Sequence, residues 1–356
     1  MNRRPGQEVG GRQLTSVRRC PYILVSVVIA EKALIAEIRR LAKPGNNPTV
    51  LTGIGDDCAV LRLAGHSRKP TEVLVTTDFS LEGIHFRRDW HPPESVGHRC
   101  LARGLSDIAA MGGQPVAAFL SLALPSDLPQ SWFKLFLRGL ITLAERYGVT
   151  LAGGDTAQSP DGILADIMVL GTVPQGQAVP RSRAQVGDRI YVSGELGGSA
   201  DAVRLMRKET RKRPKAKLNP REYPRHFFPD PRIALARILR EKGLASAMID
   251  TSDGLSSDLA HICEESQVGA ELQAASIPLA RVGRPLREVK MELALDGGED
   301  YELLFTASRA KPIPSRIAGV PITQIGQITR ERKIYLKKPH QARSELKPGG
   351  WEHFGR

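Results

Sequence analysis

The stretch Gly53-Ile-Gly-Asp-Asp-Cys-Ala-Val60 joins a glycine-bearing turn to a segment with the character of a strand. Its two glycines permit a tight turn, and the adjacent carboxylates of Asp56 and Asp57 follow directly. Neighbouring side chains in an extended segment point to opposite faces, so we expect only one of the two carboxylates to face a site. Adjacent carboxylates repel each other unless water or a cation offsets their charge. Gly-Asp-Asp is also ordinary turn composition, so its meaning depends on the rest of the chain.

Acidic residues beside Gly, Ser or Thr recur along the chain where strands and helices are expected to end. They are found in Thr76-Thr-Asp78, Ser106-Asp107, Gly153-Gly-Asp-Thr156, Asp250-Thr-Ser-Asp253 and Gly298-Glu-Asp300. Any one of them alone is most simply a helix cap or a turn former. Their recurrence in a chain of net charge +13 indicates a shared site. Oxygen ligands without His or Cys favour Mg²⁺ over zinc or iron, and magnesium among several carboxylates usually serves a polyphosphate substrate.

Strands and helices are expected to alternate, which predicts an α/β (α+β) layer structure. The expected helices cover residues 31–42, 93–111, 130–147, 197–206, 231–241 and a segment from 255 to about 265, with Ser252 or Asp253 as a candidate N-cap of the last. The expected strands cover residues 58–61, 72–79, 115–124, 149–153, 163–173, 188–193 and 303–306. The stretch 153–156 is expected to be a turn that follows a strand.

The chain is long enough for two domains. It has 356 residues, of which 41% are hydrophobic and 25% charged, as in a globular protein. A stretch rich in Gly and Pro at 173–187 predicts the boundary. We therefore expect a disordered extension at 1–28, an N-terminal α/β domain at 29–175 and a C-terminal α/β domain at 176–356. The C-terminal domain is expected to carry a basic, mobile insertion near 208–223.

The net charge of +13 raises the question of nucleic-acid binding. The basic residues concentrate near the N-terminus, at 207–225 and at 330–338, and none of these stretches carries the interleaved aromatic residues of a base-stacking surface. No run is long enough to span a membrane. Cys20, Cys58, Cys100 and Cys263 lie far apart, which favours reduced thiols in a cytoplasmic protein. We expect neither nucleic acid nor membrane as a partner.

The ordered set of acidic motifs resembles the thiamine-monophosphate kinase family, which belongs to the superfamily of aminoimidazole-ribonucleotide and selenophosphate synthetases. The resemblance runs from about Ile29 to Gly350-Trp-Glu-His-Phe354 and includes the motif Ser106-Asp-Ile-Ala-Ala-Met-Gly112. It implies an N-terminal sheet domain that dimerises and a C-terminal α/β domain that closes over it. The implied reaction is the last step of thiamine diphosphate biosynthesis. In it a cytoplasmic homodimer transfers a phosphoryl group in line from ATP to thiamine monophosphate, using several Mg²⁺ ions.

The resemblance also implies roles for individual residues. The implied metal ligands are Asp57, Thr76, Thr77, Asp78, Asp107, Asp155, Asp250 and Asp253, of which Asp57, Asp155 and Asp250 are expected to be essential for catalysis. The implied nucleotide contacts are Thr76, Gly154, Asp155, Arg181 and Ser252. The implied contacts to the thiamine end are His85, Glu299 and Trp351. An aromatic face beside a cationic thiazolium has a rationale in cation–π attraction. Three alternatives stay open: His85 as a packed histidine, Trp351 as a seal over the core, and Arg183 in place of Arg181.

This chemistry suits a chain without the familiar nucleotide signatures. There is no Gly-x-x-x-x-Gly-Lys-Ser/Thr loop, no protein-kinase catalytic loop and no Gly-x-Gly-x-x-Gly fingerprint that opens a helix. The phosphates of ATP would therefore be held mainly through metal ions. A phosphate monoester, whose second pKa is about 6, is already deprotonated at neutral pH, so the acceptor needs no general base. The obstacle is the approach of one anion to another, which cations relieve.

Three rival hypotheses remain. A selenophosphate synthetase should carry a reactive Cys beside a Lys, and Cys20 lacks that context. An aminoimidazole-ribonucleotide synthetase should lack the matches at Glu299 and Trp351. A basic scaffold or nucleic-acid-binding protein without activity would have no use for acidic clusters, which repel phosphate unless metal is present. The residues themselves indicate magnesium-dependent phosphoryl transfer, whereas the choice of thiamine monophosphate rests on the resemblance.

Overall fold

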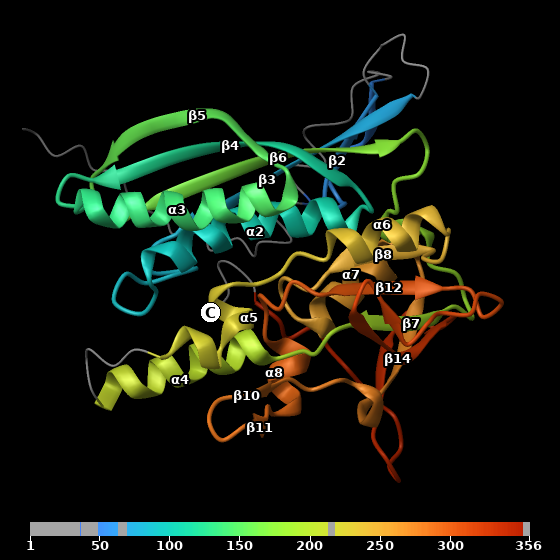
Figure 1. The fold of residues 1–356 in the computed structure, drawn as a ribbon. Coiled ribbons are helices and arrows are strands. Elements are labelled where there is room, and N and C mark those ends of the chain that lie inside the picture. The colour runs from blue at the N-terminus through green and yellow to red at the C-terminus, as the bar shows by residue number, and fades with distance from the viewer. Residues whose placement is uncertain (1–35, 37–48, 63–69, 213–217, 352–356) are drawn as a thin grey trace, which may run out of the picture.

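The computed structural model describes residues 36, 49–62, 70–212 and 218–351 of the chain. The extension expected at 1–28 lies outside the described residues, and so does the helix expected at 31–42, apart from residue 36. Two sheets organise the described part (Figure 1), one within residues 50–174 and the other within residues 189–345. Helices cover both sheets, which confirms the predicted α/β class.

The N-terminal sheet has six strands in the order β1-β2-β3-β6-β4-β5. They are β1 (Val50–Thr52), β2 (Ala59–Leu61), β3 (Thr71–Leu81), β4 (Gln114–Pro125), β5 (Thr150–Ser159) and β6 (Leu164–Pro174). Two helices, α2 (Pro93–Ala110) and α3 (Gln130–Tyr147), lie on one face of this sheet (Figure 1). Alternation along β3 and β6 buries Leu74, Ile167 and Val169 in the same core as Leu105 and Ile108 of α2.

Two glycines let α2 and α3 approach each other closely. A Cβ atom on Gly97 of α2 would lie 1.9 Å from the carbonyl oxygen of Phe136, and one on Gly139 of α3 would lie 1.9 Å from that of Glu94. No larger side chain fits at either contact. The close packing holds α2 firmly against the sheet, and α2 carries Asp107 in its last turn.

The C-terminal sheet has the strand order β16-β15-β9-β14-β7-β12-β8, with β13 paired to β14. Its strands are β7 (Arg189–Ser193), β8 (Ala247–Asp250), β9 (Gly269–Gln273), β12 (Leu303–Ala307), β13 (Arg316–Ile317), β14 (Val320–Thr329), β15 (Ile334–Lys337) and β16 (Ser344–Glu345). A separate hairpin is formed by β10 (Arg281–Val282) and β11 (Arg287–Glu288). The helices are α4 (Gly198–Lys212), α5 (Pro224–Phe227), α6 (Ile233–Glu241), α7 (Leu255–Ser266) and α8 (Met291–Asp296), with 3₁₀ turns η1 (Arg181–Arg183), η2 (Pro220–Glu222) and η3 (Ala274–Ser276).

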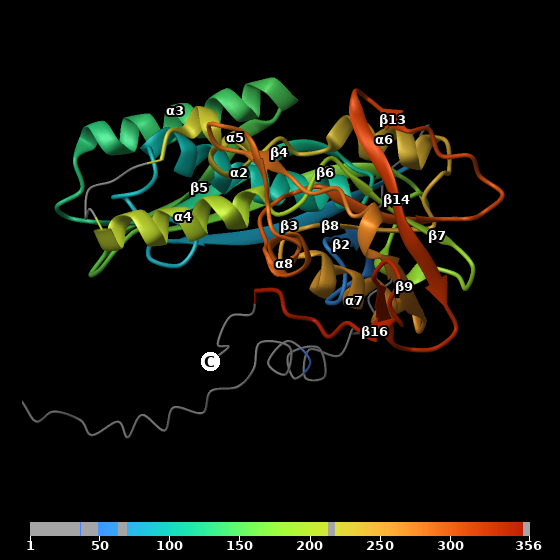
Figure 2. The ribbon, with the colours of Figure 1, turned by 90° about the horizontal axis from the view of Figure 1, so that it is seen from below.

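The two parts meet along α2, which contacts α5, α6 and β8 of the C-terminal part. Figure 2, which is turned by 90° from Figure 1, also shows α5 beside α2. Buried polar contacts cross this boundary: His98 Nε2 lies 2.7 Å from the carbonyl oxygen of Pro229, and the hydroxyl of Ser106 donates to Asp250 at 2.6 Å. No helix in the described ranges is long and apolar enough to cross a lipid bilayer.

Two stretches fold differently from the prediction. The motif 153–156 lies inside β5 and not in a turn, because β5 continues to Ser159. Gly154 has a φ of 146° and a Cβ atom there would lie 1.8 Å from the carbonyl oxygen of Leu120, so β4 and β5 approach closely there. In addition, α4 continues to Lys212, into the stretch that was expected to be a mobile insertion.

Candidate active site

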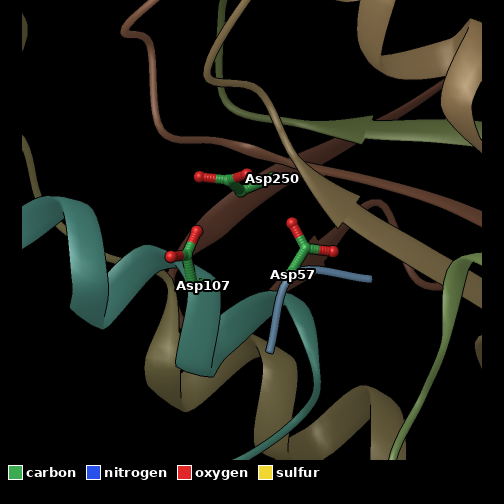
Figure 3. A group of neighbouring side chains, drawn as sticks. All are labelled: Asp57, Asp107 and Asp250. Atoms are coloured by element: carbon green, nitrogen blue, oxygen red, sulfur yellow. The ribbon is translucent and has the colours of Figure 1, made fainter. Parts of the chain in front are cut away.

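Three carboxylates from distant parts of the chain converge where α2 meets the C-terminal sheet. Asp57 lies just before β2, Asp107 on the last turn of α2 and Asp250 at the end of β8, and Figure 3 shows the three side chains pointing toward one another. One oxygen of each lies within 4.8 Å of an oxygen of the other two. Such a set of hard oxygen donors suits Mg²⁺ or Ca²⁺ better than zinc or iron. We call these three residues the aspartate cluster.

Burial and repulsion within the aspartate cluster oppose its full ionisation. Burial, together with the charge of Asp57, raises the pKa of Asp250 to about 8. Burial and the charges of Asp78 and Asp250 raise the pKa of Asp107 well above its ordinary value. Hydroxyl donors offset part of this cost, since Thr76 Oγ1 donates to Asp107 at 2.5 Å and Ser106 to Asp250. A bound cation would favour the charged forms further, so the cluster is suited to holding metal.

Arg181 fixes the orientation of Asp57. Its Nε and Nη2 donate to the two carboxylate oxygens of Asp57 at 2.9 and 2.7 Å, a bidentate pair. The peptide N–H of Arg181 donates to Asp56 at 3.3 Å. Burial and, to a lesser extent, the charge of Asp57 raise the pKa of Asp56 to about 7. The guanidinium of Arg183 instead donates to the carbonyl of Ala178. Of the two candidate arginines, only Arg181 therefore contacts the acidic stretch.

A second charged group lies next to the cluster, between β3 and the loop before β12. Arg99 and Arg103 of α2 approach the same oxygen of Glu299, at 2.6 and 3.7 Å, and Arg103 Nε lies 3.5 Å from Asp78. Although burial opposes it, the charges of Arg99 and Arg103 hold the pKa of Glu299 below its ordinary value. Asp78 interacts electrostatically with Asp107, so this group adjoins the aspartate cluster.

A small cavity opens beside these arginines. It is lined by Ser80, His85, Phe86, Val96, Arg99 and Arg103. His85 Nδ1 accepts the peptide N–H of Leu81 at 2.9 Å, which fixes the ring at this position. His85 therefore lies on the same side of the site as Glu299, Arg99 and Arg103.

The loop after β8 carries Ser252 and Asp253. Neither caps α7, whose N-cap is Gly254; the buried carboxylate of Asp258, one turn into the helix, accepts the peptide N–H of Gly254 at 3.0 Å. The carbonyl of Ser252 accepts the peptide N–H of Glu299. Trp351 reaches the same loop through its main chain, and its side chain is 48% exposed. The structure thus places Trp351 on the surface and not as a seal over the core.

Of the predicted ligands, Thr77, Asp155 and Asp253 lie apart from both the aspartate cluster and its neighbours Thr76 and Asp78. Thr77 is exposed on β3 and, by strand alternation, points to the face opposite Thr76 and Asp78. Asp155 and its neighbour Gly154 lie on the edge strand β5, which β4 and β6 separate from β3, and Asp155 is exposed. Asp253 follows β8 but does not join the three converging carboxylates. Within one chain, the described residues bring together only part of the predicted ligand set.

Arg99 and Arg103 were not predicted as site residues. Arg99 stands eight positions and Arg103 four positions before Asp107 on α2, so the three side chains share one face of the helix. Two arginines at helical spacing from an aspartate that was predicted to be a metal ligand were the available signal. A basic residue on a helix is ordinarily solvent-exposed, and nothing local in the sequence shows that the C-terminal part buries this face.

Comparisons with known proteins agree with this geometry. Two family models match, described as "AIR synthase related protein, N-terminal domain" over residues 55–173 and "AIR synthase related protein, C-terminal domain" over residues 185–338. A thiamine-monophosphate kinase of Bacillus subtilis is 35% identical over 87% of this chain and 95% of its own length. The kinase of the same name from Escherichia coli is 37% identical over 85% and 91%.

A solved structure described as "AaThiL complexed with AMPPCP and TMP" superposes with a TM-score of 0.76. It has 31% sequence identity to this chain and covers 91% of it, and the match spans 97% of the solved chain. The same family was expected from the acidic motifs, and these relatives confirm it. The chain belongs to the thiamine-monophosphate kinase family, within the AIR synthase-related proteins.

Proposed function

We propose that this protein is a phosphotransferase that moves the γ-phosphoryl group of ATP onto thiamine monophosphate, giving thiamine diphosphate and ADP. The observation that carries the proposal is the convergence of Asp57, Asp107 and Asp250 beside a cavity lined by arginine. Family membership supports the same reaction, since a related structure is described as a complex with AMPPCP and TMP. The acceptor is thus a phosphate group.

The metal of the proposal is Mg²⁺, held by the aspartate cluster with Asp78 next to it. The donor set fits, because it is made only of oxygens and its mutual repulsion is relieved by a cation. Magnesium bound there supplies positive charge to the phosphates of both substrates. We retain Thr76, Thr77, Asp155 and Asp253 as ligands of further ions; the motif match supports these four roles.

The residues around the aspartate cluster hold it in place for this reaction. Arg181 keeps both oxygens of Asp57 fixed, and Ser106 and Thr76 orient Asp250 and Asp107. Fixed charges that need no rearrangement during the reaction are the main source of catalysis in phosphoryl transfer. Because the acceptor phosphate is already an oxyanion, no residue has to remove a proton from it. Gly154, Arg181 and Ser252 are the proposed nucleotide contacts.

The thiamine end is proposed to lie near His85, Glu299 and Trp351. Glu299 stays ionised because Arg99 and Arg103 lower its pKa, so it presents a negative charge at neutral pH. The half-exposed indole of Trp351 offers an aromatic face to the cationic thiazolium. These groups favour the binding of a cationic ring that is attached to a phosphate.

The protein is proposed to act as a cytoplasmic homodimer that uses the open face of the N-terminal sheet. No helix of the described ranges covers this face, and Phe79 on β3 is 54% exposed there. Alternation places further apolar side chains on the same face: Val73, Val75, Phe119, Met168 and Leu170. An apolar sheet face of this kind is typical of a subunit interface. Cys58, Cys100 and Cys263 are free thiols, which suits a reducing compartment.

The test is formation of thiamine diphosphate from thiamine monophosphate, ATP and Mg²⁺, followed by chromatographic separation of the thiamine esters. We expect product only when all three are present, and no product at saturating concentrations would reject the function. Asp57→Asn should lower kcat at least about 100-fold with an unchanged circular dichroism spectrum. Asp127→Asn, at an exposed position before α3, is the matched control and should retain the normal rate.

A further inference from the structure

Arg103 lies in the middle of the site with 15% of its side chain exposed, and its contacts to acidic groups are long. Its Nε has no hydrogen-bond partner among the described residues, and its nearest acidic oxygens are Asp78 at 3.5 Å and Glu299 at 3.7 Å. Good hydrogen bonds from a guanidinium to a carboxylate measure about 2.7–2.9 Å. Leaving the buried Nε of an arginine without a hydrogen-bond partner costs free energy, so this N–H is expected to serve a ligand.

The other arginines near the site are already occupied. Arg181 is paired bidentately with Asp57. Arg99 binds Glu299 at 2.6 Å and also donates to the main-chain carbonyl of His226. Arg103 shares the carboxylate of Glu299 only at long range. Of these three arginines, it is the one whose donors are best placed to serve a ligand.

The position of Arg103 identifies the part of the ligand that it meets. It lies between Asp78, which adjoins the aspartate cluster, and Glu299, on the proposed thiamine side, and it lines the cavity with His85 and Ser80. A molecule that extends from Glu299 toward the aspartate cluster has to pass this guanidinium. In thiamine monophosphate, the group between the thiazolium and the transferred phosphoryl is the acceptor phosphate.

We propose that Arg103 binds the phosphate of the acceptor, donating from its planar guanidinium to the phosphate oxygens that do not attack. This inference rests on the proposed function and adds a residue to it. The attacking oxygen forms a bond to the γ-phosphorus as the bond from that phosphorus to ADP breaks, and Arg103 keeps its proton throughout. A planar fork that matches phosphate oxygens also explains why arginine is more suitable here than lysine.

The experiment compares Arg103→Met and Arg103→Lys with the wild type. Steady-state kinetics give KM for thiamine monophosphate and for ATP. Calorimetry with Mg²⁺ and AMPPCP present gives Kd for thiamine monophosphate and for thiamine, which lacks the phosphate. Arg138→Met, at an exposed arginine of α3, is the matched control. Circular dichroism and thermal melting check the fold of every variant.

In Arg103→Met, we expect KM and Kd for thiamine monophosphate to rise about 10- to 100-fold, because the charge-assisted hydrogen bonds to the phosphate are lost. Arg103→Lys should show a smaller rise, because it keeps the charge but loses the fork. KM for ATP and Kd for thiamine should stay within about threefold of the wild type. Equal weakening of thiamine and thiamine monophosphate would overturn the inference, and so would a rise in KM for ATP alone. A wild-type protein that fails to use thiamine monophosphate would reject the proposed function itself.

Discussion

The peptide N–H of Trp351 donates to the carbonyl oxygen of Asp253 at 3.0 Å. The preceding carbonyl, that of Ser252, accepts the peptide N–H of Glu299 at 2.8 Å. Two residues proposed for the thiamine end are therefore attached to the short loop that begins at Asp250 of the aspartate cluster. We therefore expect any movement of this loop to displace the proposed phosphate side and the proposed thiamine side of the site together.

Replacement of Gly350 tests this coupling. A Cβ atom there would lie 2.4 Å from the carbonyl oxygen of Asp253 and 2.6 Å from Ser257 Oγ, so Gly350→Ala must push Trp351 away from the loop. Losing one hydrogen bond of this kind costs about 1 kcal/mol, so we expect KM for thiamine monophosphate to rise about fivefold. The value of KM for ATP should not change. Steady-state kinetics with each substrate varied in turn measure both.

Gly319→Ala is the control for that experiment. Gly319 has a φ of 79° in the turn between β13 and β14, with no atom within 4 Å of the added Cβ. The substitution should destabilise the fold by about 1 kcal/mol through backbone strain and leave both KM values unchanged. If Gly350→Ala behaves in the same way as Gly319→Ala, the coupling does not exist.

Removing one carboxylate from the aspartate cluster should have opposite effects on stability and activity. Asp107 is partly buried and lies among like charges, which disfavours its ionised form in the metal-free protein. Asp107→Asn should therefore raise the Tm of the metal-free protein by about 2–4 °C while lowering kcat at least about 100-fold. Differential scanning fluorimetry at pH 7.5, with and without Mg²⁺, measures the first effect.

The response to Mg²⁺ supplies the control for Asp107→Asn. Under the proposed function, Mg²⁺ binds this site in the folded wild-type protein and not in the unfolded chain, so it should raise the wild-type Tm in a concentration-dependent manner. The same addition should raise the Tm of the variant much less. Equal Mg²⁺-induced shifts in the two proteins would show that the metal binds elsewhere.

A buried histidine pair at the boundary of the two parts predicts acid sensitivity. His91 Nε2 lies 2.9 Å from His226 Nε2, and both rings are fully buried. Burial and the charge of Arg99 lower the pKa of His91 to about 4, and burial lowers that of His226 as well. In the unfolded chain, His titrates near 6.5. Between pH 6.5 and 4 the unfolded state therefore binds protons that the folded state does not, and stability falls as the pH falls.

His91 is expected to account for about 2 kcal/mol of the folding stability that is lost between pH 7.5 and pH 5. In urea titrations at both pH values, His91→Gln should lose less stability on acidification than the wild type does, by about this amount. His340→Gln, at an exposed histidine, should follow the wild type. An acid-induced loss that is identical in all three proteins would show that the histidine pair is not responsible.

Local sequence patterns predicted the helices that build the site. The expected segments 93–111 and 130–147 agree with Pro93–Ala110 and Gln130–Tyr147, because apolar periodicity and local end signals determine both helices. The turn expected at 153–156 was wrong. Gly154 there provides the close approach of β4 to β5 and does not mark a turn, and that contact involves residues that are distant in sequence.

Contacts between the two parts were beyond what sequence patterns reveal. Asp57, Asp107 and Asp250 were expected to share a site because of their residue types, and no pattern indicated which of the other aspartates would lie apart from them in one chain. Arg103 and His226 have polar character, which favours solvent exposure in a sequence-based prediction. The burial of His226 and the partial burial of Arg103 result from docking of the C-terminal part onto α2, which depends on the shapes of both surfaces.

Arg181 and Arg183 give the sharpest test of the site geometry, because they are two positions apart and only the first touches an acidic residue. Arg181 holds both oxygens of Asp57, whereas Arg183 donates to the carbonyl of Ala178 at 3.4 Å. Residues that orient metal ligands typically contribute about 10- to 100-fold to metal affinity or activity. Arg181→Lys should therefore raise the Mg²⁺ concentration for half-maximal rate, or lower kcat, by about this factor. Arg183→Lys is the matched control, and comparable losses in the two variants would contradict the role assigned to Arg181.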